Sequence, residues 1–223
     1  MKTPFKLVVF DCDGVLADSE RITAQVLAQC LAEQGVCLDW HTVLQHFIGG
    51  SAGQDRKTAE ALVGRTLPET FWQDFFTRAH AKLAAQTKPV PHIKTVLGSL
   101  KLPYCTAASN GSLDKMHTTL GACGLLEYFS GKMFSAEQVA AGKPAPDVFL
   151  LAARQMGVPP QHCAVVEDSP VGVRAATAAG MSVFGYAALT PADALLQAGA
   201  AQTFDDMRRL PELLGCPAAD SAA

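Results

Sequence analysis

The chain has 223 residues, of which 49% are hydrophobic, enough for one large buried core or for a core with a smaller inserted domain, so disorder is not expected. Charged residues make up 17% and the net charge is −3. Nucleic acids and anionic membranes are usually bound by clustered Lys and Arg, which this composition does not suggest. We therefore expect a soluble protein that binds neither.

The cysteines and the hydrophobic runs indicate where in the cell the protein is located. Seven cysteines are scattered along the chain without a Cys-x-x-Cys pair, which favours neither a disulfide framework nor a zinc site. The apolar run near the N-terminus is interrupted by Asp11 and Asp13 before it reaches signal-peptide length, and no stretch approaches the ~20 apolar residues of a membrane helix. We expect a cytoplasmic protein, either a monomer or a weak homodimer.

Short apolar runs alternate with helical patterns along most of the chain. Residues 6–10 (KLVVF) form a continuous apolar run typical of a strand buried on both faces of a parallel sheet. Further strands are predicted at 104–108, 163–166 and 182–186, and weaker ones at 132–134 and 201–203. Helices are predicted at 112–120, 147–156 and 171–179, the last two closed by Gly157 and Gly180. This alternation predicts an α/β fold with a doubly wound, Rossmann-like parallel sheet.

The connection between the first two predicted strands is too long for an ordinary crossover. It contains helical patterns at 19–34, 39–47, 54–63 and 68–85, the first ended by Gly35 and the last begun by Pro68. We therefore predict an inserted four-helix cap domain at 18–88 and a catalytic core formed by 1–17 and 89–223.

Acidic residues follow two of the predicted strands. Asp11 and Asp13 come after the first, where Gly14 permits a sharp turn, and Glu167 and Asp168 end the strand at 163–166. The carboxyl ends of parallel strands meet at one edge of the sheet, where doubly wound folds bind ligands. Four carboxylates that converge need a counter-charge, so this pattern predicts a Mg²⁺ site.

Two further segments suggest a phosphate site at the same edge. Ser109 and Asn110 follow the strand at 104–108 and precede a helix, where a hydroxyl and backbone N–H groups suit phosphate oxygens. Lys143 lies in a loop stiffened by Pro144 and Pro146 and supplies a positive charge. Each feature alone would be read as a helix cap or a solvated lysine, but their order at successive strand ends favours phosphate binding.

The motifs DCDGVLADS (11–19), ASN (108–110), GKPAPD (142–147) and VVEDS (165–169) together resemble the haloacid dehalogenase-like hydrolases. The resemblance spans nearly the whole chain and is to the phosphatase branch with a helical cap, which includes sugar phosphatases and β-phosphoglucomutase-like proteins. It implies that Asp11 is the nucleophile and Asp13 the general acid and base. It also implies that Asp11, the Asp13 carbonyl, Glu167 and Asp168 hold Mg²⁺.

The resemblance further assigns phosphate binding to Ser109, Asn110 and Lys143. Asp13 argues for phosphoryl chemistry, because the dehalogenases of the family need no leaving-group acid and differ at that position. We expect neighbouring carboxylates to raise the pKa of Asp13, so that it holds the proton it must donate.

Outside the motifs, we interpret Asp18 and Ser19 as structural residues that tie the loop and cap the first cap helix. The turn Gly49-Gly50-Ser51, with Arg56 and Lys57 nearby, is the candidate substrate contact in the cap, although a solvated loop has the same composition.

The sequence thus predicts a Mg²⁺-dependent phosphatase that acts on a small phosphorylated metabolite, a sugar phosphate or sugar acid, through an aspartyl-phosphate. A sugar phosphomutase of the same family is an alternative. The mutases carry a histidine four residues after the Ser or Thr that matches Ser19, whereas this chain has Thr23, which favours transfer to water. A receiver-like phospho-aspartate signalling module is a second alternative, which Asp13 and the inserted cap disfavour.

Overall fold

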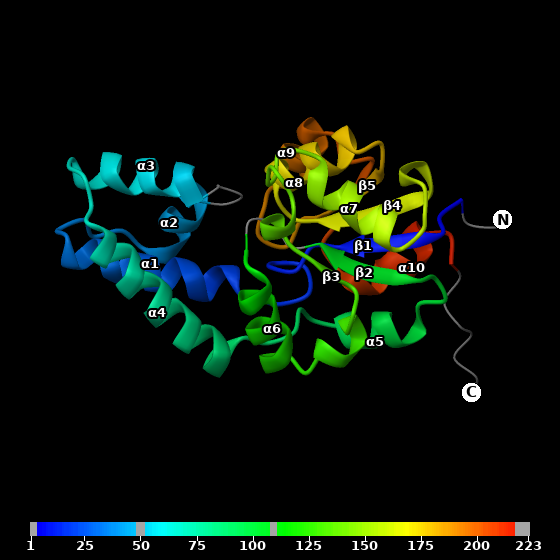
Figure 1. The fold of residues 1–223 in the computed structure, drawn as a ribbon, viewed down its shortest axis with the longest axis horizontal. Coiled ribbons are helices and arrows are strands. Elements are labelled where there is room, and N and C mark those ends of the chain that lie inside the picture. The colour runs from blue at the N-terminus through cyan, green and yellow to red at the C-terminus, as the bar shows by residue number, and fades with distance from the viewer. Residues whose placement is uncertain (1–3, 48–51, 108–110, 217–223) are drawn as a thin grey trace.

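The computed structural model describes residues 4–47, 52–107 and 111–216. Within these ranges a six-stranded parallel sheet has the order β3-β2-β1-β4-β5-β6 (Figure 1). The strands are β1 (Leu7–Phe10), β2 (Tyr104–Ala107), β3 (Met133–Phe134), β4 (Cys163–Glu167), β5 (Ser182–Tyr186) and β6 (Gln202–Phe204).

The central strands are buried on both faces, as their continuous apolar runs predict. Successive side chains of β1 point to opposite faces, because a strand has a period of two residues. Leu7 and Val9 pack in one hydrophobic cluster, and Val8 and Phe10 pack in another.

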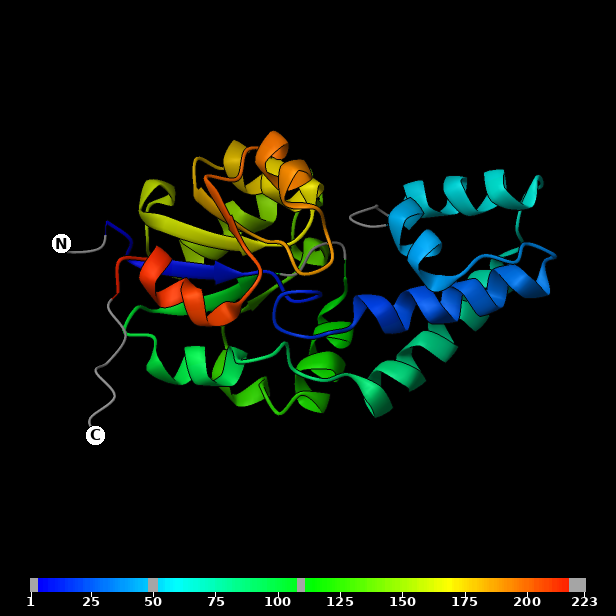
Figure 2. The ribbon, with the colours of Figure 1, turned by 180° about the vertical axis from the view of Figure 1, so that it is seen from behind.

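Helices cover both faces of the sheet (Figures 1 and 2). The cluster with Val8 and Phe10 is covered by α5 (Ile93–Ser99), α6 (Leu113–Ala122) and α10 (Leu210–Leu213). The cluster with Leu7 and Val9 is covered by α7 (Asp147–Gln155), α8 (Pro170–Ala178) and α9 (Ala192–Ala198). These helices and the sheet form the three layers of an α/β fold.

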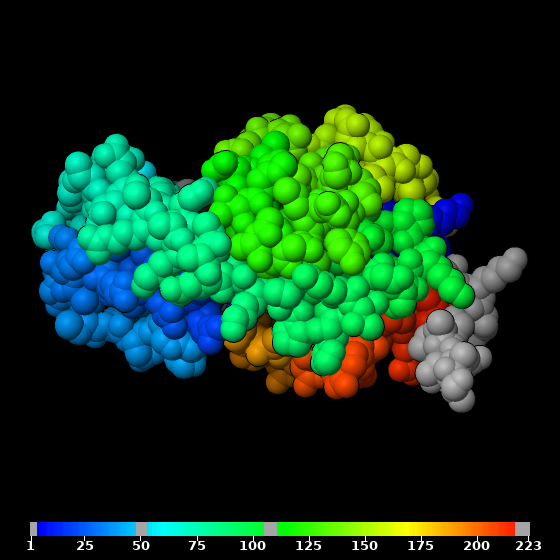
Figure 3. Space-filling model, turned by 90° about the horizontal axis from the view of Figure 1, so that it is seen from below, coloured from blue at the N-terminus to red at the C-terminus, as the bar shows by residue number. Residues whose placement is uncertain are grey.

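Four helices between β1 and β2 form a separate lobe: α1 (Glu20–Glu33), α2 (Trp40–Phe47), α3 (Ala52–Val63) and α4 (Glu69–Gln86). The lobe has its own hydrophobic cluster, which includes Leu31, Val43 and Trp72. The carboxyl end of β1 points toward the lobe (Figure 2). The lobe also touches the core directly, because α4 contacts α6 (Figure 3).

The predicted strands and helices match the described ones to within two residues at each end. Three helices in the described residues were missed, α5, α9 and α10, because each is only four to seven residues long and too short for a clear helical period. The exact boundaries of cap and core, at 17/18 and 88/89, stay a prediction. No helix in the described parts of the chain combines the length and the hydrophobicity that crossing a membrane requires.

Helix α9 offers a matched pair of leucines for testing the core. Leu195 is fully buried and packs against the position of Gly185 in β5, where even an added Cβ would lie 3.1 Å from the Leu195 side chain. Its neighbour Leu196 is 45% exposed.

We predict that Leu195→Ala lowers the free energy of unfolding by about 2–5 kcal/mol, because it leaves a cavity between α9 and the sheet. Leu196→Ala should change it by only about 0.5 kcal/mol or less. Urea titration of the two variants measures the difference. Equal losses would contradict the placement of α9.

Candidate active site

The acidic side chains that follow β1 and end β4 lie together at the carboxyl edge of the sheet. Asp11, Glu167 and Asp168 are buried, and each offers a carboxylate oxygen within 4.8 Å of the others. The pairing of β1 with β4, with Phe10 beside Val166, brings these residues of distant sequence to one point.

Lys143 joins this cluster from the loop before α7. Its Nζ atom lies 2.8 Å from Asp11 Oδ1 and 2.5 Å from Glu167 Oε1, and its side chain is 1% exposed. The ammonium also lies 4.9 Å from the centre of the Phe149 ring. Burial disfavours a charged lysine, but Asp11 and Glu167 outweigh that effect and raise the pKa of Lys143. Lys143 is therefore a fixed positive charge beside the predicted nucleophile.

Three carboxyl groups share the ammonium of Lys143 in this cluster. Burial raises the pKa of Asp11 to about 8, with Lys143 opposing the shift and Glu167 adding to it. Burial, Glu167 and Asp11 also raise the pKa of Asp168 well above its ordinary value. Carboxylates with raised pKa values are stabilised by any added positive charge. A donor set made only of carboxylate oxygens suits a hard divalent cation such as Mg²⁺, so these residues fit the predicted metal.

Two glycines leave the space that the carboxylates occupy. Gly14 has φ +76°, and a Cβ there would lie 2.0 Å from Asp168 Oδ2. A Cβ on Gly172 in α8 would lie 1.9 Å from Glu167 Oε1. Glu167 also accepts hydrogen bonds from the backbone N–H and the hydroxyl of Ser169. Glu167 is thus held on one oxygen by Ser169 and on the other by Lys143.

Asp13 is also buried, and both of its oxygens have partners. Oδ1 accepts a short hydrogen bond from the Ser19 hydroxyl, and Oδ2 lies 2.8 Å from Lys115 Nζ. The expectation of a raised pKa for Asp13 is wrong in this state. Burial does raise it, but Lys115, Ser19 and Lys143 together lower it below the ordinary value. These residues stabilise the ionised carboxylate more than burial opposes it.

Ser19 has one of the two roles predicted for it: its hydroxyl ties the loop after β1, but it does not cap α1. It is the N-cap residue of α1, but its side chain accepts no capping hydrogen bond, and its hydroxyl donates to Asp13. Asp18 forms an ion pair with Arg21 at 3.2 Å, in line with a structural role. Thr23 donates its hydroxyl to the Ser19 carbonyl at 3.1 Å. The residues that restrain Asp13 are therefore Ser19 and Lys115.

Some predicted site residues lie outside the described residues, namely Ser109, Asn110, Gly49, Gly50 and Ser51. Gly111, the first described residue after 108–110, accepts a hydrogen bond of 2.7 Å from the Ser135 hydroxyl. Arg56 forms an ion pair with Glu69 at 2.6 Å and lies over the Trp72 ring. These contacts are within the helical lobe, and a contact of Arg56 with substrate stays a prediction.

Sequence reasoning missed Lys115 and Glu20. Lys115 lies on α6, 102 residues after Asp13, and had no motif to mark it. Glu20 follows Ser19 at the start of α1, and its charge is close enough to Lys115 and Asp13 to influence both. Only the position of Glu20, directly after the last residue of the first motif, could have indicated that it faces the site.

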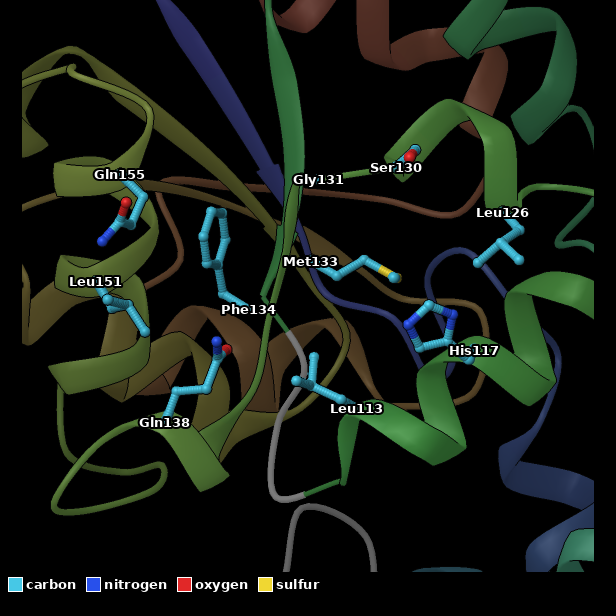
Figure 4. Close-up of a pocket in the computed structure, with 10 residues that line it drawn as sticks. All are labelled: Leu113, His117, Leu126, Ser130, Gly131, Met133, Phe134, Gln138, Leu151 and Gln155. Carbon is cyan, nitrogen blue, oxygen red and sulfur yellow. The ribbon is translucent and has the colours of Figure 1, made fainter.

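A cavity of about 580 Å³ lies at the edge of the sheet, over β3 (Figure 4). His117 and Leu113 line it from α6, Met133 from β3 and Leu151 from α7. The residues that line it include none of the carboxylates of the cluster, so this cavity is distinct from the candidate active site.

Comparisons with known proteins agree with this geometry. The family described as haloacid dehalogenase-like hydrolase matches residues 5–180. The 6-phosphogluconate phosphatase of Escherichia coli (strain K12) is 31% identical over 207 residues, which cover 92% of this chain and 93% of that protein.

Solved structures show the same relationship. A haloacid dehalogenase-like protein of unknown function from Agrobacterium tumefaciens str. C58 is 34% identical, with a TM-score of 0.86 over 95% of this chain and 98% of that one. A HAD family hydrolase from Deinococcus radiodurans R1, with bound phosphate and sodium, is 30% identical, with a TM-score of 0.81 over 96% of this chain and 97% of that one. The chain therefore belongs to the haloacid dehalogenase-like hydrolases and is a phosphatase of that family.

Proposed function

We propose that this phosphatase hydrolyses a small phosphorylated metabolite, a sugar phosphate or a phosphorylated sugar acid, through a covalent phosphoryl group on Asp11. The observation that carries the proposal is the buried Lys143, which joins Asp11 to Glu167 beside Asp168 at the carboxyl edge of the sheet. The similarity to a 6-phosphogluconate phosphatase supports the substrate class.

In the first step, a carboxylate oxygen of Asp11 attacks phosphorus and the bond to the ester oxygen breaks. Asp11 is a weak nucleophile toward an anionic ester, so a fixed positive charge must lower the repulsion. Lys143 supplies that charge 2.8 Å from Asp11 Oδ1. The departing alkoxide takes a proton from Asp13. In the second step, Asp13 takes a proton from water, whose oxygen attacks phosphorus and releases phosphate and the Asp11 carboxylate.

Asp13 has to hold a proton in the first step, although its pKa is lowered in the substrate-free state. A bound phosphate group brings further negative charge close to Asp13, and a nearby negative charge raises the pKa of a carboxyl group. Substrate binding would thus favour the protonated form needed for the first step, and the ionised form would serve as the base in the second.

Mg²⁺ would be held by carboxylates of Asp11, Asp168 and Glu167 together with the Asp13 carbonyl. When bound, such an ion neutralises charge on the phosphate oxygens and orients the ester. The raised pKa values of Asp11 and Asp168, which an added cation would lower, support this assignment.

The two alternatives receive less support. A phosphomutase would return the phosphoryl group to a second hydroxyl, and the histidine expected of a mutase is replaced by Thr23, which binds the Ser19 carbonyl. A receiver-like signalling module is excluded by membership of the hydrolase family.

We predict that Asp11→Asn lowers kcat by about 10⁴-fold or more, because an amide does not attack phosphorus. The fold should be retained, since asparagine keeps the shape of the side chain and Lys143 stays paired with Glu167. Phosphate release and circular dichroism measure the two effects. Asp18→Asn, on the same loop, is the matched control and should keep wild-type turnover. An active Asp11→Asn variant would end the covalent mechanism.

We predict that Asp13→Asn lowers kcat by about 10²–10⁴-fold on alkyl phosphates, the usual contribution of a general acid. The loss should be smaller on p-nitrophenyl phosphate, whose leaving group scarcely needs a proton. The comparison requires kcat for both esters in wild type and variant. If both esters lose activity equally, Asp13 does not protonate the leaving group.

We predict that EDTA abolishes activity, that Mg²⁺ restores it and that Ca²⁺ inhibits, because the larger ion accepts more flexible coordination and misplaces the nucleophile. Mg²⁺ should also raise Tm, since it binds the folded state. Asp168→Ala should need more Mg²⁺ for both effects. Full activity in excess chelator would refute the metal assignment.

The metal-free protein gives a second readout of the same site. Asp11 has an ordinary pKa of 3.8 and a folded-state pKa of about 8, so the folded state binds more protons between these values. The free energy of unfolding therefore falls as the pH rises from about 4 through about 8. Tm in EDTA should fall over this range, and Mg²⁺ should reduce the fall.

A further inference from the structure

We propose that Lys115 and Glu20 form a specificity site that binds a hydroxyl group on the carbon next to the ester carbon of the substrate. The substrate class is then phosphorylated polyols of the form R–CH(OH)–CH₂–O–PO₃. This inference rests on the proposed function, because it places the leaving group beside Asp13.

The position of Lys115 follows from its contact with Asp13. Lys115 Nζ lies 2.8 Å from Asp13 Oδ2. A leaving-group oxygen that receives a proton from Asp13 has to come within about 2.6–3.2 Å of that carboxylate. Substituents on the next carbon of the leaving group then lie beside the ammonium. Lys115 would therefore face the leaving group of the substrate.

Lys115 retains hydrogen-bonding capacity for a ligand. An ammonium has three N–H donors. Among the described residues, Lys115 Nζ donates a hydrogen bond to Asp13 Oδ2. The Lys115 side chain is 29% exposed. Lys115 can thus donate to a substrate oxygen while it stays paired with Asp13.

Glu20 supplies the complementary acceptor. It begins α1 directly after Ser19, whose hydroxyl binds Asp13, and it is half-buried. Ser19 and Lys115 bind the two oxygens of the same Asp13 carboxylate, which brings the start of α1 close to Lys115. The charge of Glu20 also helps to raise the pKa of Lys115. A hydroxyl accepts one hydrogen bond and donates another, so it matches an ammonium beside a carboxylate.

The surrounding charges favour a neutral hydroxyl over an anionic group at this position. Asp13 lies on one side of Lys115, and Asp55 of α3 lies close enough to Glu20 to influence its pKa. A carboxylate next to the ester would therefore meet three acidic side chains and one lysine, whereas a hydroxyl meets a donor and an acceptor. The carboxylate of a sugar acid would have to lie farther along the chain of the substrate.

The test compares sn-glycerol 3-phosphate, which has the hydroxyl, with 3-hydroxypropyl phosphate, which lacks it. Wild type should prefer the first by about 10- to 100-fold in kcat/KM, as expected for a hydrogen bond to a charged group. Lys115→Met should reduce this ratio to about 1–3, and Glu20→Ala should reduce it by a smaller factor. Lys94→Met, which removes an exposed ammonium from α5, is the matched control and should keep the wild-type ratio.

The ratio of kcat/KM for the two esters shows whether Lys115 binds the substrate hydroxyl or only positions Asp13. If Lys115 only positions Asp13, Lys115→Met lowers kcat/KM equally for both esters and the ratio stays as in wild type, which would overturn the inference. Equal use of the two esters by wild type, or hydrolysis of p-nitrophenyl phosphate without hydrolysis of either, would also overturn it. A wild-type protein that hydrolyses no ester at all would instead refute the proposed function.

Discussion

The contact of Lys143 with Asp11 and Glu167 is the interaction on which the site depends. A buried ammonium without partners would be strongly destabilising, and so would the carboxylates without it. The contact requires β1 and β4 to be neighbours and the loop before α7 to lie over their ends. The cluster also requires glycine at positions 14 and 172, where a Cβ would collide with Asp168 and Glu167 respectively. The parallel sheet thus serves to bring charges together that are more than a hundred residues apart in the sequence.

The ammonium of Lys143 is outnumbered by the carboxyl groups around it. This unequal number of acidic and basic groups is the feature of the fold that suits the proposed chemistry. Four buried carboxylates, Asp11, Asp13, Glu167 and Asp168, face two ammonium groups, Lys143 and Lys115. The pKa values of Asp11 and Asp168 are raised, whereas that of Asp13 is lowered. The carboxyl groups that are hardest to ionise therefore lie where a cation would sit, while Asp13 is paired separately with Ser19 and Lys115. Two carboxyl groups two residues apart are set for different roles by different partners.

Much of the core followed from the sequence because its signals are local. The apolar runs of β1 and β4, and the acids that end them, are contiguous in the chain, and the parallel arrangement places them at one edge. The helices α5 and α9 were missed because seven residues give no clear periodicity. The partners of Asp13 were missed for another reason. Whether Ser19 caps α1 or binds Asp13, and whether Lys115 faces solvent or the site, depends on how α1 and α6 meet in three dimensions.

The pairing of Asp13 also links the site to the helical lobe. Asp13 belongs to the loop after β1, Ser19 begins α1 of the lobe, and Lys115 lies on α6 of the core. Helix α4 of the lobe contacts the same α6, where His80 lies 3.8 Å from Asp114. A rotation of the lobe would therefore move Ser19 relative to Asp13 while Lys115 stayed with the core. The two oxygens of one carboxylate are thus held by different parts of the molecule, so the orientation of Asp13, the proposed acid and base, depends on the position of the lobe.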